Sequence, residues 1–331
     1  MHTEPTAADR RPLGRSGIEV SVLGLGTAAL AGLYDEVVEA DAIATVQHAV
    51  ELGLRLFDTA PLYGNGLAEE RLGSALAHVP TDAVVVSTKV GRLLTSEGGA
   101  DPDSIFKGAP ALRPVFDFSA DGVARSLEDS LRRLGRSRVD IVHVHDPDDH
   151  EDQALRETIP ALMRWRDEGV VGAIGVGMNQ AEMLTRFARE TDIDCVLCAG
   201  RYTLLDQTGL VELLPVCTSN DVAVIIGGVF NSGLLADPRP GAHFDYVPVA
   251  DEVLDRAIRI SDACREHDVP LKAAALQFPL GHAAVACVLT GTRSVAELEE
   301  NARLVEHHLP VELWSSLRSK GLLDDHVPTP G

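Results

Sequence analysis

The sequence alternates eight short apolar runs with helix-like segments, and this order constrains the fold more than any other feature. Each run has the length and the β-branched content of a buried strand. Strands that alternate with helices form a parallel sheet covered by helices, and eight such units fit a closed (β/α)8 barrel better than an open sheet. The eight runs are residues 20–25, 54–58, 84–89, 139–145, 173–176, 195–199, 222–226 and 285–289.

Three segments depart from this rhythm. A short hairpin is expected at residues 13–20, before the first strand. Long loops rich in glycine and proline, at residues 92–118 and 231–248, follow the third and seventh strands. Since we find no linker and no shift in composition, we expect one barrel domain over residues 1–331. The expected helices are 38–52, 68–78, 120–134 with Ser119 as its cap, 159–168, 181–189, 210–217, 252–267 and 295–305.

The overall composition is that of an ordinary globular protein and excludes several functions. The chain has 331 residues, 45% hydrophobic and 24% charged, with a net charge of −21. This charge argues against a nucleic-acid or anionic-membrane surface and favours an uncharged small-molecule substrate. Five cysteines scattered through apolar runs indicate buried thiols in a reducing compartment. No signal-peptide or membrane-spanning pattern is found, so we expect a cytoplasmic protein.

Polar side chains finish three consecutive strands. The stretch LRLFDTAPLYGNG places Asp58 at the end of the second strand and Tyr63 in the turn beyond it. Lys89 ends the third strand and His145 ends the fourth. Reaction sites of such barrels lie at the carboxyl ends of the strands, so these side chains are expected to converge. A lysine in an apolar strand needs a counter-ion, and Asp58 is the natural one.

A buried lysine beside a phenol has a chemical use. Positive charge favours the phenolate, so the pKa of Tyr63 is predicted to fall below its usual value of about 10. Tyr63 could then exchange protons near neutrality, while His145 hydrogen-bonds a substrate oxygen. With no activated nucleophile evident, the set favours proton exchange at an alcohol or carbonyl while another agent moves hydride. Taken alone, Asp58 could equally be a cap and Tyr63 a half-buried aromatic.

Two further pairs suggest metal or redox chemistry at first sight. His143 and His145 share one strand face, but a metal-dependent hydrolase needs further ligands that the eighth strand does not offer. We therefore expect no metal and assign His143 to the core. Cys195 and Cys198 have CxxC spacing, yet on a strand they point to opposite faces.

Several segments resemble the aldo-keto reductase superfamily. FDTAPLYGNG, STKVG and DIVHVHDP occur in its order and spacing, and the similarity extends from RPLGRSGIEVSVLGLGTA to SVAELEENARLV. VFDFSADGVARSLEDSLRRLG, HDPDD, GVGMNQ, AGRYTLLDQ and GGVFNSGLL resemble the branch with D-threo-aldose 1-dehydrogenases, L-fucose dehydrogenases and pyridoxal 4-dehydrogenase. The resemblance implies that Asp58, Tyr63, Lys89 and His145 form a catalytic tetrad.

The same resemblance implies a nicotinamide nucleotide as cofactor. Asn179 matches the position that binds the carboxamide, and Phe230 and Ser232 match the stretch along the pyrophosphate. The other implied cofactor residues are Gly26, Thr27, Asp58 and, at the adenosine end, Gly291, Thr292, Arg293, Glu297 and Asn301.

Three positions depart from the family pattern. Ala199 replaces a usual glutamine, and Gly227-Gly228 replace an aromatic that often stacks on the nicotinamide. Gly291 and Glu297 stand where NADP-preferring members commonly have lysine and arginine. Because a carboxylate repels a phosphate but accepts from a ribose hydroxyl, we expect NAD to be preferred, with NADP possible through Arg293.

These observations predict oxidation of an anomeric hydroxyl to a lactone, with Tyr63 as general base. The branch that these segments resemble implies, as substrate, a free aldose of the L-fucose or D-threo type, or pyridoxal in its hemiacetal form. Asp146 is expected to contact it beside His145, while Asp148 and Asp149 are solvated. The alternatives are an NADPH-dependent aldehyde or ketone reductase and a nucleotide-sensing regulatory subunit with the same fold. Oligomeric state is left open.

Overall fold

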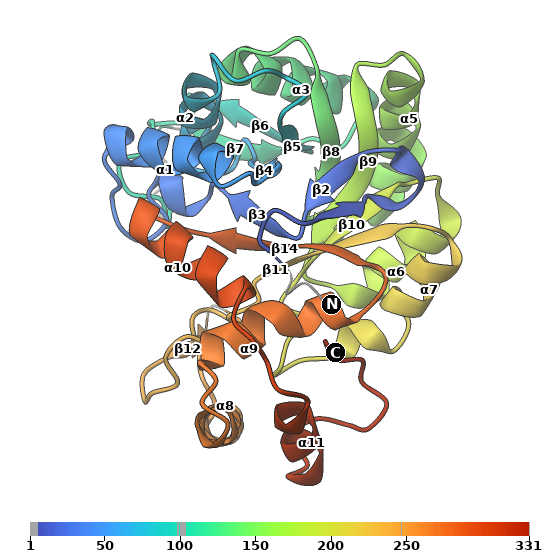
Figure 1. The fold of residues 1–331 in the computed structure, drawn as a ribbon. Helices are drawn as coiled ribbons and strands as arrows, with labels where there is room; N and C mark the ends of the chain where they lie inside the picture. Colours follow the sequence, from blue (N-terminus) through green and yellow to red (C-terminus); the bar gives the residue numbers. More distant parts are fainter. Residues whose placement is uncertain (1–5, 98, 100–103, 246, 331) are drawn as a thin grey trace.

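Eight parallel strands close into a barrel, and the predicted (β/α)8 architecture is confirmed (Figure 1). The computed structural model describes residues 6–97, 99, 104–245 and 247–330. Each barrel strand pairs in parallel with the next, and the last returns to the first. In chain order the strands are β3 (Leu23–Gly26), β4 (Leu56–Asp58), β5 (Val85–Val90), β8 (Val139–His145), β9 (Val171–Met178), β10 (Cys195–Ala199), β11 (Ala223–Gly227) and β14 (Val285–Gly291).

The helices surround the strands, and their termini follow local sequence signals. Ser119 caps α3 as predicted, because its side chain accepts a hydrogen bond from the Gly122 amide. Gly135, at φ +63°, ends the same helix. The helices are α1 (Glu39–Glu51), α2 (Leu67–Ala75), α3 (Ala120–Leu134), α4 (Glu151–Gln153), α5 (Ile159–Asp167), α6 (Ala181–Glu190), α7 (Leu213–Ser219), α8 (Asp251–Glu266), α9 (Leu271–Gln277), α10 (Val295–Val305) and α11 (Val311–Ser319).

Strand alternation divides the core into two layers. One set of buried side chains fills the barrel, and the other packs between the strands and the helices. Cys195 belongs to the inner set and Cys198 to the outer one, which confirms that the two thiols point to opposite faces. All five cysteines are buried and unpaired, as expected. Trp314 on α11 is also buried, so this terminal helix packs on the barrel.

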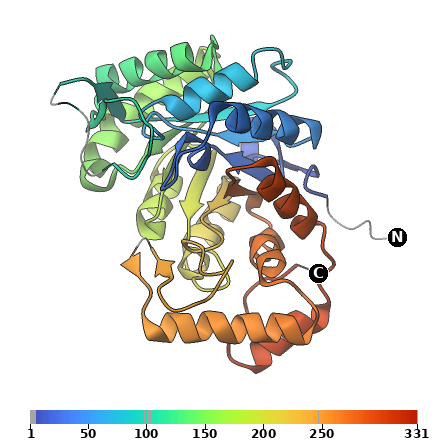
Figure 2. The ribbon, with the colours of Figure 1, turned by 90° about the vertical axis from the view of Figure 1, so that its left-hand side faces the viewer.

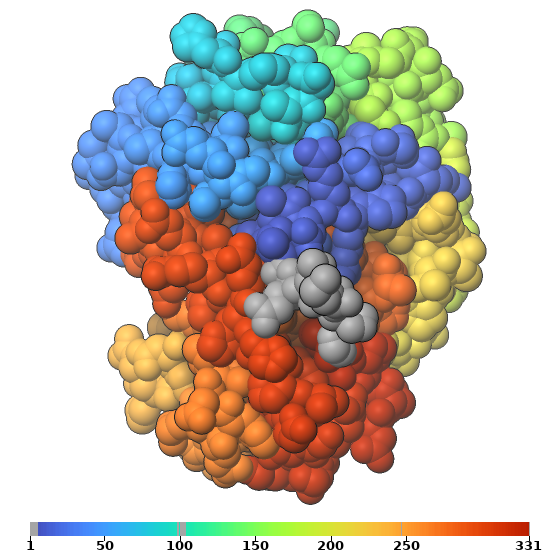
Figure 3. Space-filling view, viewed as in Figure 1, coloured from blue at the N-terminus to red at the C-terminus, as the bar shows by residue number. Residues whose placement is uncertain are grey.

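The N-terminal hairpin closes one end of the barrel. β1 (Arg10–Pro12) pairs with β2 (Glu19–Ser21), and Leu13 and Val20 join the inner core. Gly14 is required in the turn, because a Cβ there would lie 2.5 Å from the Asp221 carbonyl oxygen. Figure 3, viewed as in Figure 1, shows the dark-blue N-terminal residues lying over this end.

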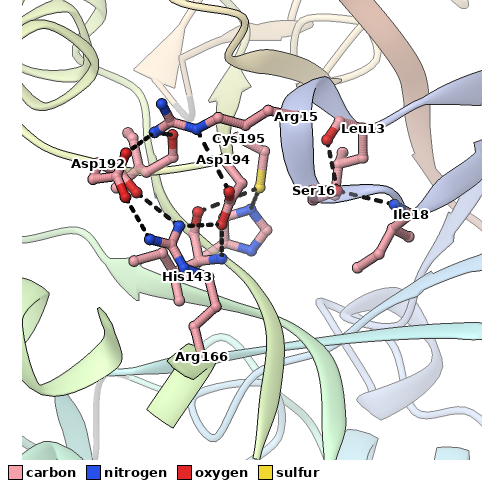
Figure 4. Close-up of polar contacts among 11 residues, drawn as sticks. Leu13, Arg15, Ser16, Ile18, His143, Arg166, Asp192, Asp194 and Cys195 are labelled. Atoms are coloured by element: carbon pink, nitrogen blue, oxygen red, sulfur yellow. Dashed lines mark hydrogen bonds and ion pairs between the residues drawn. The ribbon is translucent and has the colours of Figure 1, made fainter. Parts of the chain in front are cut away.

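A charged network fastens the same end (Figure 4). Arg166 donates to Asp194 Oδ2 at 2.8 Å and to Asp192 Oδ2 at 2.6 Å. Arg15, from the hairpin, pairs with Asp192 at 2.5 Å and donates to the Ile193 carbonyl. Hairpin, α5 and the segment before β10 are thereby joined.

The two predicted loops lie at the opposite end and contain more order than the sequence indicated. β6 (Arg92–Thr95) pairs antiparallel with β7 (Arg113–Phe116) inside the first loop. The second loop holds the two-residue strands β12 (His243–Phe244) and β13 (Val247–Pro248). Both project toward the left of Figure 2. Neither antiparallel pair was predicted from the sequence, because strands of two to four residues leave little alternation to detect.

Two smaller differences concern helices. The expected helix at 210–217 begins as a 3-10 turn and becomes α-helical only at Leu213. Helix α5 is preceded by a π-helical turn over Ala154–Thr158. Among the described residues, none of the helices is both long enough and apolar enough to cross a membrane.

Candidate active site

The structure brings together the four polar side chains that the sequence places at, or just beyond, the ends of three consecutive barrel strands. Asp58 ends β4, Lys89 lies near the end of β5 and His145 ends β8, while Tyr63 follows β4 in a turn. Parallel pairing places the ends of β4, β5 and β8 side by side. Lys89 Nζ lies 2.5 Å from Asp58 Oδ2 and 3.0 Å from the Thr59 carbonyl oxygen.

Lys89 also contacts the phenol. Its Nζ lies 4.7 Å from the centroid of the Tyr63 ring and hydrogen-bonds the Tyr63 side chain. Lys89 and Asp58 are 1% and 2% exposed, so this ion pair is shielded from solvent. Burial lowers the pKa of Lys89, but Asp58 and Tyr63 outweigh it and raise that pKa above its ordinary value. The ammonium is therefore charged at neutral pH.

The predicted pKa of Tyr63 is wrong in direction. Burial raises the pKa of Tyr63 above 10.0, and this effect exceeds the lowering by Lys89. The Asp58 and Asp146 carboxylates raise it further. The sequence showed the cation but not the desolvation or the second carboxylate. In this structure Tyr63 is a neutral phenol near pH 7, and it lines the cavity described below.

His145 and Asp146 form the next part of the site. The His145 ring stands at 88° to that of Tyr63, with centroids 5.8 Å apart. Burial, Lys89 and Arg92 lower the pKa of His145 well below its usual value, so the imidazole is neutral. Its Nε2 lies 3.5 Å from Asp146 Oδ2, and that oxygen accepts from Arg92 at 2.7 Å. Asp146 thus lines the cavity beside His145, and its carboxylate pairs with Arg92.

A cavity of about 630 Å³ opens above these groups. Its apolar wall includes Leu62, Ile105, Phe106 and Phe116. Its polar lining consists of Tyr63, Lys89, Arg92, His145, Asp146, Asp148, Asp149, His150, Asn179 and Gln180. Asp148 and Asp149 are exposed, as expected, and also stand at its rim. The volume is that of an ordinary small-molecule site.

The implied cofactor residues fall into three groups. Asn179 lines the first cavity, where Ala199 also lies. Phe230, Gly291, Arg293, Glu297 and Asn301 line an adjoining cavity of about 500 Å³, and Leu33 borders both cavities. Gly26 and Thr27 join β3 to β4 instead: Thr27 donates its amide and its hydroxyl to the Asp58 carbonyl. Ser232 is exposed at φ +57°, beyond Phe230.

The two cavities suit an extended dinucleotide. One end of the groove reaches the tetrad, and the other reaches the start of α10, whose amide groups favour a phosphate. The buried Thr292 hydroxyl, between the cavity-lining residues Gly291 and Arg293, has no hydrogen-bond partner among the described residues. The residues present therefore fit a nicotinamide nucleotide.

Carboxylates form ion pairs with the two cations that line the second cavity. Arg293 pairs with Asp35 at 3.0 Å and with Glu297 at 3.3 Å, and its amide donates to Glu297 Oε2. Lys272, from α9, pairs with Glu300 at 2.7 Å. Both cations lining this cavity are thus already balanced by carboxylates.

Sequence reasoning missed Arg92 and its surroundings. Arg92 lines the cavity with its guanidinium 4.7 Å from the Phe116 ring centroid, and it pairs with Asp146. The only sequence signal was a cation two residues after the end of a strand, in KVGR. Phe116 was assigned to a loop, so its place in the wall could not be predicted.

His143 is a buried core histidine, as the sequence indicated. It is 0% exposed, and burial with Lys89 lowers its pKa to about 3. Its ring nitrogens lie near Ser87 and Cys195. No cluster of three or more potential metal ligands occurs within the described part of the chain.

Comparisons with known proteins agree with this geometry. Residues 22–321 match the aldo/keto reductase family. The chain is 42% identical to D-threo-aldose 1-dehydrogenase of Pseudomonas sp, with 99% of each chain covered. It is 43% identical to pyridoxal 4-dehydrogenase of Microbacterium luteolum, over 98% of this chain and all of that one. L-galactose dehydrogenase of Arabidopsis thaliana is 34% identical over 91% of this chain and 89% of its own length.

A solved structure shares the fold. The holo form of the aldo-keto reductase AKR11C1 from Bacillus halodurans superposes with a TM-score of 0.77 at 27% identity, covering 97% of this chain and 98% of that one. Family, relatives and fold thus agree over nearly the whole length. The chain belongs to the aldo/keto reductase family, whose enzymes are oxidoreductases that use nicotinamide cofactors.

Proposed function

We propose that this enzyme oxidises the anomeric hydroxyl of a free aldose, or of pyridoxal in its hemiacetal form, to a lactone. The observation that carries the proposal is the hydrogen-bonded set Asp58–Lys89–Tyr63, facing His145 at the mouth of a cavity. Relatives named for an aldose and for pyridoxal, each above 40% identity over nearly the whole chain, support this class of substrate. Both substrates present a ring carbon that bears a hydroxyl and an ether oxygen.

The residues divide the work of oxidation. Tyr63, once deprotonated, accepts the proton of the anomeric hydroxyl as that hydroxyl becomes a carbonyl. Lys89 stabilises the phenolate, and Asp58 keeps Lys89 charged and oriented. Neutral His145 hydrogen-bonds the same substrate oxygen and favours one orientation of the ring. When bound, the nicotinamide nucleotide supplies the acceptor for the hydride that leaves the anomeric carbon.

The cavity supports an uncharged polyol or pyridoxal. Phe106 and Phe116 offer ring faces, and Asp148, Asp149 and His150 offer acceptors and donors at the rim. Three carboxylates at the same cavity disfavour a sugar phosphate. Of these three carboxylates, Asp146 would contact a ring hydroxyl of the substrate together with its partner Arg92.

NAD is the proposed cofactor. Glu297 and Asp35 accept from the Arg293 guanidinium, and Glu300 holds Lys272, so a 2′-phosphate would have to displace carboxylates from both cations. A ribose hydroxyl can instead donate to a carboxylate. Asn179 would hold the carboxamide, and the segment with Phe230 and Ser232 would lie along the pyrophosphate.

A second candidate is reduction of a small aldehyde or ketone with NADPH at the same site. The neutral state of Tyr63 favours it, because a phenol near pH 7 donates a proton to a forming alkoxide. The two candidates share all four residues and differ in nucleotide and direction.

A substrate panel tests the proposal. L-fucose, D-arabinose, L-galactose and pyridoxal are each mixed with NAD or NADP, and absorbance of the reduced nucleotide is followed. We expect turnover with NAD and a lactone product, lost in Tyr63→Phe. Faster reduction of aldehydes with NADPH supports the second candidate. Wild-type turnover no better than that of Tyr63→Phe contradicts both and favours a nucleotide-sensing protein.

A further inference from the structure

Three buried side chains continue from the Asp58–Lys89 pair into the barrel. Ser87 Oγ lies 2.9 Å from Asp58 Oδ1, the carboxylate oxygen that does not bind Lys89. His143 Nδ1 lies 3.1 Å from Ser87 Oγ, and Cys195 Sγ lies 3.5 Å from His143 Nε2. Ser87, His143 and Cys195 are each 0% exposed. Figure 4 shows the last of these contacts, between His143 and Cys195.

The charge of Asp58 fixes the direction of the hydrogen bonds from His143 through Ser87, whereas the Cys195 thiol also has a second acceptor, the Ile174 carbonyl oxygen at 3.9 Å. Asp58 pairs with an ammonium, so it is a carboxylate that only accepts, and the single Ser87 proton points to it. Ser87 must then accept from His143, which puts the imidazole proton on Nδ1. His143 Nε2 is left as an acceptor, and the Cys195 thiol is the donor that faces it. In this arrangement Cys195, His143 and Ser87 each donate once toward the Asp58 carboxylate.

We infer that Ser87, His143 and Cys195 are positioning residues that set how strongly Asp58 and Lys89 act on Tyr63. This inference rests on the proposed function, in which Tyr63 exchanges the proton. The three residues do not line the cavity and carry no net charge. They act by hydrogen bonds, each strengthened by the one behind it.

The physical link to Tyr63 passes through the charge of Asp58. The Asp58 carboxylate raises the pKa of Tyr63, while Lys89 lowers it. A hydrogen bond from Ser87 withdraws part of the carboxylate charge, which weakens that repulsion and leaves more of the Lys89 charge for the phenol. Loss of the Ser87 hydroxyl therefore raises the pKa of Tyr63 and lowers the phenolate fraction at any fixed pH.

The other ionisable groups around Tyr63 lie on separate elements and stay in place in this experiment. They are Lys89 on β5, Asp58 on β4, His145 on β8, Asp146 after β8 and Arg92 on β6. None of them contacts Cys195. Substitution of Ser87, His143 or Cys195 should therefore change the pKa of Tyr63 without adding or removing a charged side chain.

The experiment titrates the Tyr63 phenol by absorbance, as the difference between each protein and the same protein with Tyr63→Phe. Ser87→Ala is expected to raise the pKa of Tyr63 by about half a unit or more, which lowers oxidation at fixed pH about three- to tenfold. His143→Leu, which removes the donor, shifts it less. His143→Asn keeps an N–H near the position of Nδ1, so the pKa of Tyr63 in this variant should lie close to the wild-type value.

Cys195→Ser and Cys195→Ala form the mildest matched pair. Serine keeps a donor to His143 and alanine does not, and both are smaller than the native side chain. We expect the smallest shift from Cys195→Ala and none from Cys195→Ser, so that effects decrease with distance from Asp58. If the Ser87 or His143 variants fail to fold, the difference in the pKa of Tyr63 between Cys195→Ala and Cys195→Ser still tests the inference.

A structural role alone would give a different pattern. Variants that lower the thermal midpoint but titrate and turn over as wild type does would overturn the inference. The titration needs neither nucleotide nor substrate, so it remains decisive even if the substrate panel shows no turnover and the proposed function fails. Unchanged titration with a working substrate panel would reject the positioning role alone.

Discussion

Both ends of the barrel hold a buried carboxylate against basic side chains, but they use its partners differently. At the closed end, Asp194 accepts from Arg166 and from the Ile174 amide, both at 2.8 Å. The arginines there also donate to main-chain carbonyls of residues 192 and 193. At the open end, Lys89 binds Asp58 and one carbonyl, and directs its remaining donor to a phenol on a cavity wall.

This difference distinguishes ion pairs that stabilise the fold from a group of side chains that can take part in a reaction. A network whose donors and acceptors are satisfied within the chain stabilises the fold and has nothing to offer a ligand. A buried ammonium that touches a titratable group beside a cavity stores electrostatic energy that a proton transfer can use. The following predictions would break or sharpen this contrast, beginning with the largest effect.

Loss of the Tyr63 hydroxyl should have the largest effect. Tyr63→Phe removes the group that exchanges the proton, so kcat is expected to fall by about 10²- to 10⁴-fold. Nucleotide affinity, measured by fluorescence quenching, should change little. Tyr202→Phe is the matched control, because that hydroxyl is buried and has no partner among the described residues. Equal activity in both variants would remove Tyr63 from the mechanism.

The closed end should respond in stability rather than in rate. Asp194→Ala strips acceptors from Arg166 and from the buried Ile174 amide, and we expect a loss of about 2–3 kcal/mol in unfolding free energy. Urea denaturation measures that loss, and kcat at a temperature where the variant is folded should stay within about twofold. A large fall in kcat would mean that the two ends are coupled.

Arg92 should affect the substrate more than the chemical step. Arg92→Met keeps the packing on Phe116 but releases Asp146, so kcat/KM is expected to fall about tenfold, mainly through KM. Arg92→Lys should lie between wild type and Arg92→Met. Steady-state kinetics over a range of sugar concentrations separates the two constants. A change confined to kcat would assign Arg92 to the reacting atoms instead.

The nucleotide end should show the smallest effect. Glu297→Gln removes one carboxylate from Arg293, and the NADP-to-NAD ratio of kcat/KM is expected to rise about fivefold. Glu299→Gln, on the same helix but outside the cavity, is the control. If neither variant changes the ratio, the ion pairs of Arg293 do not decide the preference.

Much of this molecule could be predicted from patterns that repeat. The period of the strands predicted the barrel, and the runs 139–145 and 195–199 coincide with β8 and β10. A polar residue at the end of a buried run marked Asp58, Lys89 and His145. These signals are local, and a closed barrel converts local position along a strand into position in space.

What could not be predicted depends on contacts between distant segments. Arg92 meets Asp146 across 54 residues, and the β6–β7 pair that carries it left no clear periodic signal. The pKa of Tyr63 depends on how closely the protein surrounds it, which no spacing reveals. Ser87 and His143 looked like ordinary strand residues, since only the barrel places them behind Asp58.

The pH dependence of oxidation in the wild-type enzyme tests the central claim most directly. In the proposed oxidation the phenolate accepts the proton, and the pKa of Tyr63 is raised above 10.0, so kcat/KM for oxidation should increase about tenfold per pH unit from neutrality toward pH 10. Reduction, which uses the neutral phenol, should stay flat over the same range. An oxidation profile that levels off near neutrality, or that persists in Tyr63→Phe, would contradict the account.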